Sequence, residues 1–371
     1  MRLLEINSVC GIRSTGRIVT DIATEYEQNG WEVKIAYGRE TVPEQFSRFA
    51  VRIGNDLNVR INALQCRLFD NDGFTAKAQT KQFLAWADEY DPDELWLHNL
   101  HGYYINLELL FGWIKSRPQM KVKWTFHDCW AFTGHCSHFS YEGCYKWKTE
   151  CSNCPLKNEY PSSFFLDNSN KNFNKKKYLF TGIENLTIIA PSYWLKNLIG
   201  ESFLGEYDIE VKHNTIDTEA FKPTPSDFKS KYGLENKKIV LGVATAWGPK
   251  KGLYDFYKLA NLLPNSYAVV LVGLSAKQMK QAPREIVAIS RTNSKEELAQ
   301  IYSAADVFLN PSKEEAFGLT TLEAIRCGTK AIALKGTACE EVILENGGLL
   351  VNDSVEEMVT AIIETVETPN I

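Results

Sequence analysis

A loop and helix in the last third of the chain carry the residues best suited to hold an anionic ligand. Glu315 and Glu323 lie on either side of Gly318, Leu319 and Thr320, which follow an apolar strand and open a short helix. Backbone N–H groups at a helix start lack partners, and the helix dipole favours an anion there. The segment therefore predicts a phosphate site with two carboxylates for sugar hydroxyls. Thr320 and Glu323 also fit a capping box that needs no ligand.

Two adjacent lysines supply a second set of candidate anion-binding groups. Lys250 and Lys251 stand in the loop Trp247-Gly248-Pro249-Lys250-Lys251-Gly252. A fixed ammonium there would stabilise negative charge on a bound ligand. The alternative for any single lysine is a solvated surface position.

Polar residues in the first half follow predicted strands. Ser14, Thr15 and Gly16 belong to a glycine-containing loop after the first strand, which lacks the G-x-G-x-x-G pattern and is equally consistent with an ordinary strand-to-helix connection. His127 and Asp128 follow one strand, and two further histidines, His98 and His101, follow another. Because ligands of parallel sheets bind beyond the carboxyl ends of the strands, these side chains are candidates for contact with a ligand. The alternative for His127 is a structurally bonded histidine.

Four of the nine cysteines gather in one stretch, at Cys136, Cys144, Cys151 and Cys154. Four thiols suffice for a tetrahedral zinc site, and the last two have the spacing of a zinc knuckle, although the second knuckle is missing. His135 or His138 could replace one thiol. Reduced structural thiols are the main alternative, and disulfides come last in a reducing compartment. Such a zinc would be structural, because protein ligands would fill all four positions.

Strands and helices alternate along the chain, which predicts an α/β protein with parallel sheets. Two such patterns occur, and the polar stretch between about residues 192 and 238 separates them. We expect a first domain over residues 1–195, with a cysteine-rich insertion at about 129–160, and a second over 205–371. Two facing domains of this kind would enclose a cleft.

Composition excludes several classes of protein. The chain of 371 residues has 41 basic and 46 acidic side chains. Residues 1–190 are neutral overall, so the whole net charge of -5 lies in residues 191–371. Neither half has the basic excess of a nucleic-acid binder, and no nucleic-acid partner is expected. No apolar run reaches the length of a membrane span, and the N-terminus lacks the pattern of a signal peptide, which predicts a cytoplasmic protein.

The segment from Pro311 to Gly328 resembles the Glu-x7-Glu signature of retaining family-4 glycosyltransferases, which have the GT-B fold of two Rossmann-like α/β domains. The segments 213–223, 247–252 and 346–350 also resemble that family. One departure is Ala246, where the family usually has an arginine that shares diphosphate binding with the lysine. Either Lys250 or an arginine of the first domain would replace it, or diphosphate binding would be weakened. The chain also ends before the longer C-terminal helix that is usual in the family.

The resemblance implies roles for individual residues. Glu323 would bind the nucleotide ribose, Glu315 the donor sugar and Lys251 the diphosphate, and the loop around Gly16 would approach the donor phosphates and the acceptor. His127 would touch the donor sugar, which makes His127, Glu315 and Lys251 the catalytic candidates. Gly16, Lys250, Lys251, Gly318, Leu319, Thr320 and Glu323 are the donor-binding candidates, and Ser14, Thr15, His98, His101 and Asp128 lie on the acceptor side.

The expected activity is transfer of a sugar, with retention, from a nucleotide diphosphate donor to a glycan acceptor in bacterial surface polysaccharide synthesis. No catalytic metal is expected. A lipid-linked acceptor would bring the protein to the inner face of the cytoplasmic membrane, and Lys175, Lys176 and Lys177 are candidates for contact with anionic lipid. A solvated helix face is the alternative for these lysines. The alternative functions are a nucleotide-sugar epimerase of the same fold and a non-catalytic nucleotide-sugar-binding protein.

Overall fold

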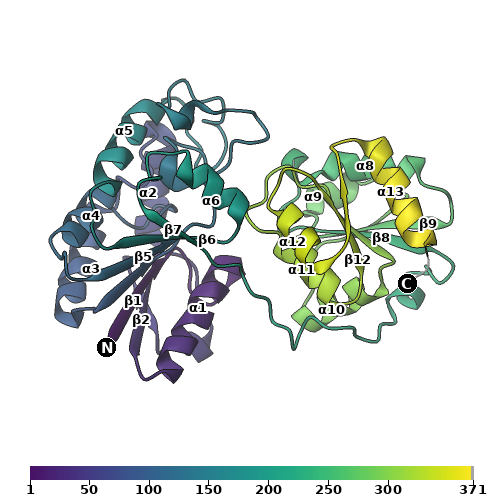
Figure 1. Cartoon of the computed structure of the whole chain (residues 1–371), viewed down its shortest axis with the longest axis horizontal. Coiled ribbons are helices and arrows are strands. Elements are labelled where there is room, and N and C mark those ends of the chain that lie inside the picture. Colours follow the sequence, from purple (N-terminus) through teal and green to yellow (C-terminus); the bar gives the residue numbers. More distant parts are fainter. Residues whose placement is uncertain (369–371) are drawn as a thin grey trace. The chain divides into compact units, whose positions relative to one another are not determined.

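The computed structural model describes residues 1–368, and the chain divides into two units, Met1–Lys212 and His213–Ile371. Each unit is a parallel sheet with helices on both faces (Figure 1). The α/β prediction is confirmed for both. The first unit extends beyond residue 195, because another helix and an edge strand join its sheet before the chain enters the second unit. Among the helices of residues 1–368, none combines the length and apolar character needed to cross a membrane.

The sheet of the first unit has seven strands in the order β3-β2-β1-β4-β5-β6-β7, and every pairing is parallel. The strands are β1 (Arg2–Asn7), β2 (Glu32–Tyr37), β3 (Ala50–Arg52), β4 (Glu94–Leu97), β5 (Lys121–Thr125), β6 (Leu186–Ala190) and β7 (Asp208–Val211). The helices are α1 (Arg13–Gln28), α2 (Asp56–Phe69), α3 (Lys77–Tyr90), α4 (Leu107–Lys115), α5 (Ser169–Phe180) and α6 (Tyr193–Gly200).

The sheet of the second unit has six parallel strands in the order β10-β9-β8-β11-β12-β13. The strands are β8 (Lys238–Val243), β9 (Tyr267–Val272), β10 (Ile286–Ile289), β11 (Val307–Asn310), β12 (Lys330–Leu334) and β13 (Leu349–Val351). The helices are α7 (Phe228–Lys231), α8 (Leu253–Leu262), α9 (Ala276–Gln281), α10 (Lys295–Ala304), α11 (Leu319–Arg326), α12 (Cys339–Asn346) and α13 (Val355–Glu367). Two buried apolar clusters make up most of its core.

In each sheet the order of the strands reverses at one place, the switch point. In the first unit β1 lies beside β4, and in the second β8 lies beside β11. In the first sheet β2 and β3 lie on one side of the central pair, and β5, β6 and β7 lie on the other. In the second sheet β9 and β10 lie on one side, and β12 and β13 lie on the other. Loops at such a switch point part from each other and leave a crevice beyond the strand ends, which is where ligands of open α/β sheets bind.

The cysteine-rich insertion between β5 and α5 has little regular structure apart from two short 3-10 helices, η2 (Trp130–Phe132) and η3 (Lys146–Lys148). Aromatic side chains attach it to the sheet. Phe132 stacks on Phe126 at the end of β5, with 6.4 Å between ring centroids, and contacts Trp147 at 5.1 Å. Buried aromatic area therefore holds this segment beside the ends of the strands.

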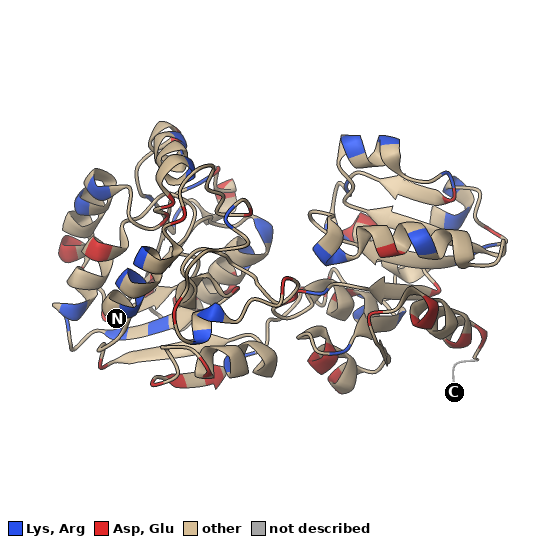
Figure 2. Ribbon diagram, turned by 90° about the horizontal axis from the view of Figure 1, so that it is seen from above, with Lys and Arg blue, Asp and Glu red and all other residues tan. Residues whose placement is uncertain are grey.

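Basic and acidic side chains are interspersed over the ribbons of both units (Figure 2). This distribution agrees with the absence of a basic excess in the sequence.

Candidate active site

In the second unit, Lys251 and Glu315 face each other across the switch point. Lys251 ends the 3-10 turn η4 (Pro249–Lys251) after β8, and Glu315 lies in the loop after β11. Lys251 Nζ is 2.6 Å from Glu315 Oε2 and donates to the Glu314 carbonyl at 3.2 Å. Burial acts to lower the pKa of Lys251, but the carboxylate of Glu315 outweighs it and the net shift is upward. Lys251 is therefore a permanent, localised positive charge.

Lys250 lies beside this pair. Its Nζ is 3.1 Å from Glu314 Oε2, and its carbonyl accepts a 2.8 Å hydrogen bond from the Lys313 N–H, so the two loops are tied together. The side chain of Ala246 is exposed and adds no charge. Two lysines from one turn thus supply the positive field at this end of β8.

Helix α11 begins at Gly318, whose φ of +99° places it in the left-handed region. A Cβ there would lie 2.7 Å from Cys339 Sγ, so both conformation and space require glycine. No side chain caps the helix, and the first N–H groups, at Leu319 and Thr320, face its open end. These are the amides at which the sequence predicts the anion site.

Glu323 does not form the capping box that the sequence allows. The helix starts at Gly318 rather than at Thr320, and Glu323 Oε2 instead accepts a 3.0 Å hydrogen bond from the hydroxyl of Tyr302 in α10. Tyr302 is fully buried. It holds the carboxylate one turn into α11, where a ribose hydroxyl could donate to it.

In the first unit, the loop residues after β1 lie at the start of α1. The helix begins at Arg13, so Ser14, Thr15 and Gly16 form its first turn. Gly16 is buried, and its carbonyl accepts a 2.9 Å hydrogen bond from the Gly11 N–H. Ser14 is exposed and Thr15 is half-buried. No side chain caps this helix start, so its first backbone amides lack intrahelical partners.

His98 does not face solvent as an acceptor-side residue would. Its side chain is 0% exposed. Its Nε2 is 3.2 Å from Glu5 Oε2, and its Nδ1 is 3.2 Å from His127 Nε2. Burial lowers the pKa of His127 to about 4 and that of His98 well below its usual value. The placement of His98 on the acceptor side is thus corrected: it lies behind His127, which is itself partly exposed.

His101 and Asp128 form a second pair at the same sheet edge. His101 Nε2 is 2.8 Å from Asp128 Oδ2, and its Nδ1 is 3.0 Å from the hydroxyl of Tyr160 in the cysteine-rich insertion. Burial acts to raise the pKa of Asp128, but His101 overcomes this and lowers it to about 2. The pKa of His101 rises because Asp128 outweighs the effect of burial. Each group of the pair therefore favours the charged form of the other.

The four thiols of the insertion act on one another electrostatically: Cys136 on Cys151 and Cys154, and Cys151 on Cys144. The thiol of Cys136 donates to Cys154, which lowers the pKa of Cys154 to about 7, while Cys151 Sγ accepts from the Gly134 N–H at 3.3 Å. Among residues 1–368, no group of three or more histidine, cysteine or acidic side chains is arranged to hold a metal ion. The structure therefore does not confirm the predicted zinc site.

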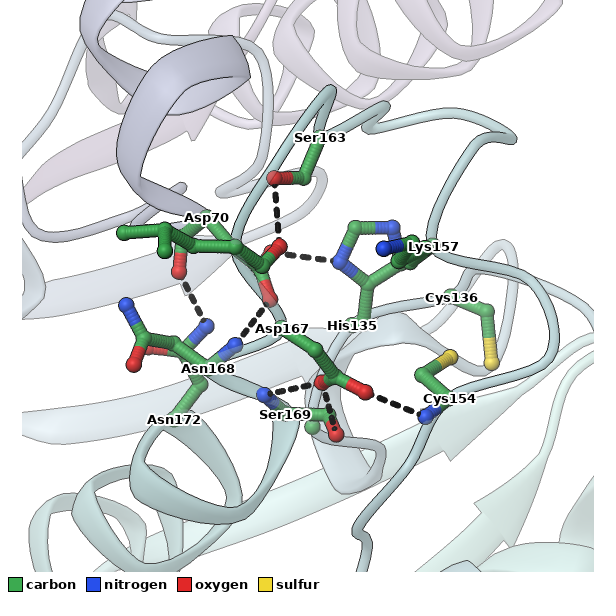
Figure 3. A network of polar contacts seen from close by, with 12 residues as sticks. Asp70, His135, Cys136, Cys154, Lys157, Ser163, Asp167, Asn168, Ser169 and Asn172 are labelled. Atoms are coloured by element: carbon green, nitrogen blue, oxygen red, sulfur yellow. Dashed lines mark hydrogen bonds and ion pairs between the residues drawn. The ribbon is translucent and has the colours of Figure 1, made fainter.

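The neighbouring polar network holds the insertion in place (Figure 3). His135 Nδ1 lies 2.5 Å from the buried Asp70 Oδ1 at the end of α2, and the Asn168 N–H donates to Asp70 Oδ2 at 2.7 Å. The Cys154 N–H donates to Asp167 at 2.6 Å. His135 is thus paired with a carboxylate through Nδ1.

The lysines of α5 do not form one basic surface. Lys176 is buried, and its Nζ donates to the carbonyls of Trp130 at 2.8 Å and Thr133 at 3.2 Å. Lys175 pairs with Glu108 at 2.7 Å. Lys177 is exposed, and the side chain of Lys175 is 37% exposed beside Glu108. The prediction that these three lysines bind lipid together is corrected, because one of them supports the cysteine-rich insertion instead.

Comparison with known proteins identifies the second unit. Residues 237–368 match the family described as glycosyl transferases group 1. The second unit is a group 1 glycosyltransferase domain. Its match includes Lys251, Glu315 and Glu323, so the geometry described above belongs to that domain.

Similarity to glycosyltransferases extends beyond this domain. WcaC of Escherichia coli K12, named as a colanic acid biosynthesis glycosyl transferase, is 24% identical over 95% of this chain and 88% of its own. Sucrose-phosphate synthase of Thermosynechococcus elongatus has a TM-score of 0.71 at 16% identity, over 98% of this chain and 89% of its own. HepE of Anabaena, solved with UDP-glucose, has a TM-score of 0.65 at 16% identity, over 99% and 90%. The fold is GT-B, as predicted.

Three polar residues of these sites were not found from the sequence: Glu5, Tyr160 and Tyr302. Glu5 left a signal, because a carboxylate between Leu4 and Ile6 interrupts an otherwise apolar strand. The two tyrosines left none, since a tyrosine at a half-apolar position is ordinary.

Proposed function

We propose that the protein transfers a sugar from a nucleotide diphosphate donor to a glycan acceptor, with retention at the anomeric carbon, in the synthesis of a bacterial surface polysaccharide. The observation that carries the proposal is the placement of Lys251 against Glu315 beside the open start of α11, within a group 1 glycosyltransferase domain. The similarity to WcaC supports the polysaccharide assignment. The UDP-glucose bound to HepE supports a nucleotide sugar as the donor.

The proposed chemistry uses protein groups around the diphosphate. The bond between the anomeric carbon and the diphosphate oxygen breaks, and the acceptor oxygen bonds to that carbon on the same face. The acceptor proton passes to the departing diphosphate oxygen. Lys251 and the amides of Leu319 and Thr320 stabilise the negative charge of the leaving group. Glu323 accepts from the ribose, and Glu315 and His127 contact the donor sugar.

The decisive experiment is transfer with a panel of nucleotide sugars, after thermal shift has selected the donor. The anomeric configuration of the first product is read by proton NMR. We expect transfer with the configuration of the donor, and Glu323→Ala should weaken donor binding. An inverted product would overturn retention. Sugar interconversion without an acceptor would indicate an epimerase, and donor binding without turnover would indicate a binding protein.

We propose that the acceptor is lipid-linked and that the first unit contacts the membrane. The contact surface is apolar and consists of one face of α2 and the adjoining loop 164–166. This surface, called the α2 surface, consists of Leu57, Ile61, Leu64, Phe164, Phe165 and Leu166, which are between 46% and 70% exposed. The two segments adjoin, since the Phe164 N–H donates to the Arg67 carbonyl at 2.7 Å. An exposed patch of this kind usually marks an interaction site.

The charges around the α2 surface support an anionic bilayer as its partner. Arg60 and Arg67 are exposed on the same helix, and neither forms an ion pair with any of residues 1–368. The nearby carboxylates are engaged, Asp56 with Arg52 and Asp70 with His135. Apolar side chains bordered by unpaired arginines suit the interface of an anionic membrane.

Vesicle co-sedimentation tests this surface. The wild-type protein should bind vesicles rich in phosphatidylglycerol and not those of phosphatidylcholine alone, and Leu64→Ser with Phe165→Ser should abolish binding. Lys171→Glu on α5 is the matched control and should bind as the wild type does. Unchanged vesicle binding by the double variant would contradict the proposal. So would a wild-type protein that binds no vesicles but forms a dimer that the double variant loses.

A structural zinc at the four cysteines stays a prediction that rests on their spacing. Total metal analysis of the purified protein tests it. Zinc would hold the insertion and take no part in the transfer, and its absence would leave the aromatic contacts and the Asp70 network as the supports of this segment.

A further inference from the structure

A chain of three side chains leads from the middle of the first sheet to the candidate sugar-binding histidine. It runs from Glu5 on β1 through His98 after β4 to His127 after β5, with 3.2 Å at each of its two contacts. The first two side chains are 0% exposed. The rings of His98 and His127 stack with their centroids 5.4 Å apart and their planes 14° from parallel. Trp96 stacks on the other side of His98 at 6.0 Å.

The protonation states of the three groups depend on one another. A neutral imidazole carries one N–H, so each contact holds a single proton that one side must donate. If Glu5 is a carboxylic acid, it donates to His98 Nε2. His98 then donates from Nδ1 to His127 Nε2, and His127 must carry its own proton on Nδ1. If Glu5 is a carboxylate, every donor and acceptor is reversed and His127 Nδ1 becomes an acceptor.

The surroundings of Glu5 favour the acid. Its second oxygen, Oε1, is buried without a hydrogen-bond partner among residues 1–368, which is costly for a carboxylate. The charged group nearest to it is Glu94, which is paired with Lys123 at 2.8 Å, and Cys10 also faces it. No cation faces Glu5 among these groups. Burial, with a smaller contribution from Glu94, raises the pKa of Glu5 well above its usual value.

The surroundings of His127 leave its free nitrogen for a ligand. Asp128 and His101 are the charged groups that act on it, and they are bonded to each other. Within residues 1–368, Nδ1 of His127 has no hydrogen-bond partner, and the residue is partly exposed at the carboxyl end of the sheet. An N–H at this position can donate to a sugar hydroxyl oxygen, whereas a bare nitrogen cannot.

We propose that Glu5 and His98 are positioning residues that fix the ring plane and the tautomer of His127, so that its Nδ1 presents an N–H to the donor sugar. The identity of the ligand rests on the proposed function. The tautomer does not, and it can be measured in the free protein.

Long-range proton–nitrogen correlation spectra of the full chain with 15N-labelled histidine test the proposal, with His127 assigned by its loss in His127→Gln. We expect a neutral His127 protonated on Nδ1 between pH 6 and 8. Protonation on Nε2, or an imidazolium in this range, would overturn the proposal, and this result needs no variant.

Two substitutions of Glu5 separate positioning from simple stability. Glu5→Gln keeps a donor for His98 Nε2 and should keep the His127 tautomer. Glu5→Met removes the donor at similar volume, so His127 should exchange between tautomers and kcat should fall about tenfold with less change in donor KM. Tyr104→Phe is the control, since it removes one buried hydrogen bond, to the Asn99 carbonyl, at the same strand end.

The outcomes distinguish the positioning role of Glu5 from the proposed function. An unchanged His127 spectrum in Glu5→Met would overturn the positioning role, and so would the same disturbance in Tyr104→Phe. If the spectra behave as expected but no nucleotide sugar is turned over, the proposed function fails while the proton arrangement stands.

Discussion

Lys251 is the residue whose removal should most directly reduce transfer. In the proposed reaction its ammonium meets the charge of the departing diphosphate, which is fully developed only as the sugar bond breaks. Lys251→Ala should therefore lower kcat more than it raises donor KM. Removing one fixed donor of this kind typically costs about 10²- to 10³-fold, or ~2.7 to 4 kcal/mol. Because the Lys251 side chain is 34% exposed, water will replace part of its effect, and we expect the lower figure of about 100-fold.

The pairing of Lys251 with Glu315 sharpens this prediction. The ammonium is 2.6 Å from Glu315 and also touches the Glu314 carbonyl, so two groups of the neighbouring loop hold it in place. Lys251→Arg keeps the charge but moves it, and should recover only part of the rate. Initial rates over a range of donor concentrations give kcat and KM for each variant.

The control for Lys251 is Lys313→Ala. Lys313 lies in the same loop region but pairs with Asp255 at 3.3 Å and Asp353 at 2.8 Å, away from Glu315. It should change kcat less than threefold. Turnover in Lys251→Ala equal to that of the wild type would refute the assignment of the diphosphate site, and an equal loss in both variants would indicate a general effect on the domain.

Three further predictions concern the scaffold. Burial lowers the pKa of Lys176 to about 7, so the folded state binds fewer protons than the unfolded state above that pH. The contribution of this group to the free energy of unfolding therefore rises with pH between about 7 and 10.5. Measured by urea unfolding, the free energy of unfolding should increase from pH 7 to pH 9 by roughly 2 to 3 kcal/mol more in the wild type than in Lys176→Met. An equal change with pH in both proteins would contradict the pKa shift. Gly273→Ala should cost about 2 to 4 kcal/mol, because φ is +100° and a Cβ would lie 1.7 Å from the Ala244 carbonyl oxygen. Gly233→Ala, with a similar positive φ and open space, should cost only about 1 to 2 kcal/mol by the same assay. The thiol of Cys136 lowers the pKa of Cys154 to about 7, whereas burial raises the pKa of Cys151 to about 11. Iodoacetamide at pH 7.5 should therefore alkylate Cys154 faster than Cys151, as measured by mass spectrometry before and after chelation. If both thiols are protected until a chelator is added, bound zinc is the cause instead.

Much of the second unit could be predicted because its signals are local. The strand–helix alternation and the short segments around Lys251 and Glu315 each lie within about twenty residues, where hydrophobic period and turn chemistry act. Glu323 was placed on α11 for the same reason. Its hydrogen bond to Tyr302 could not be predicted, because that residue belongs to a different helix.

The first unit shows where local patterns stop. A run of three lysines looked basic in sequence, but helix geometry turns Lys176 into the core while Lys175 and Lys177 stay outside. The four cysteines have the spacing of zinc ligands, yet within residues 1–368 no group of three or more such side chains is arranged to hold a metal ion. Spacing along the chain limits which side chains can meet and does not decide whether they do.

By itself the sequence determined the fold class, the two-domain organisation and the residue types at the strand ends, because these depend on patterns within single elements. The tertiary structure decided which of those residues act together. Glu5 and His98 are 93 residues apart and meet only because β1 pairs with β4 across a crossover. Tyr160 reaches His101 only because aromatic packing holds the insertion against the sheet. Contacts of this kind are stabilised by burial after the chain has folded, and no short stretch of sequence records them.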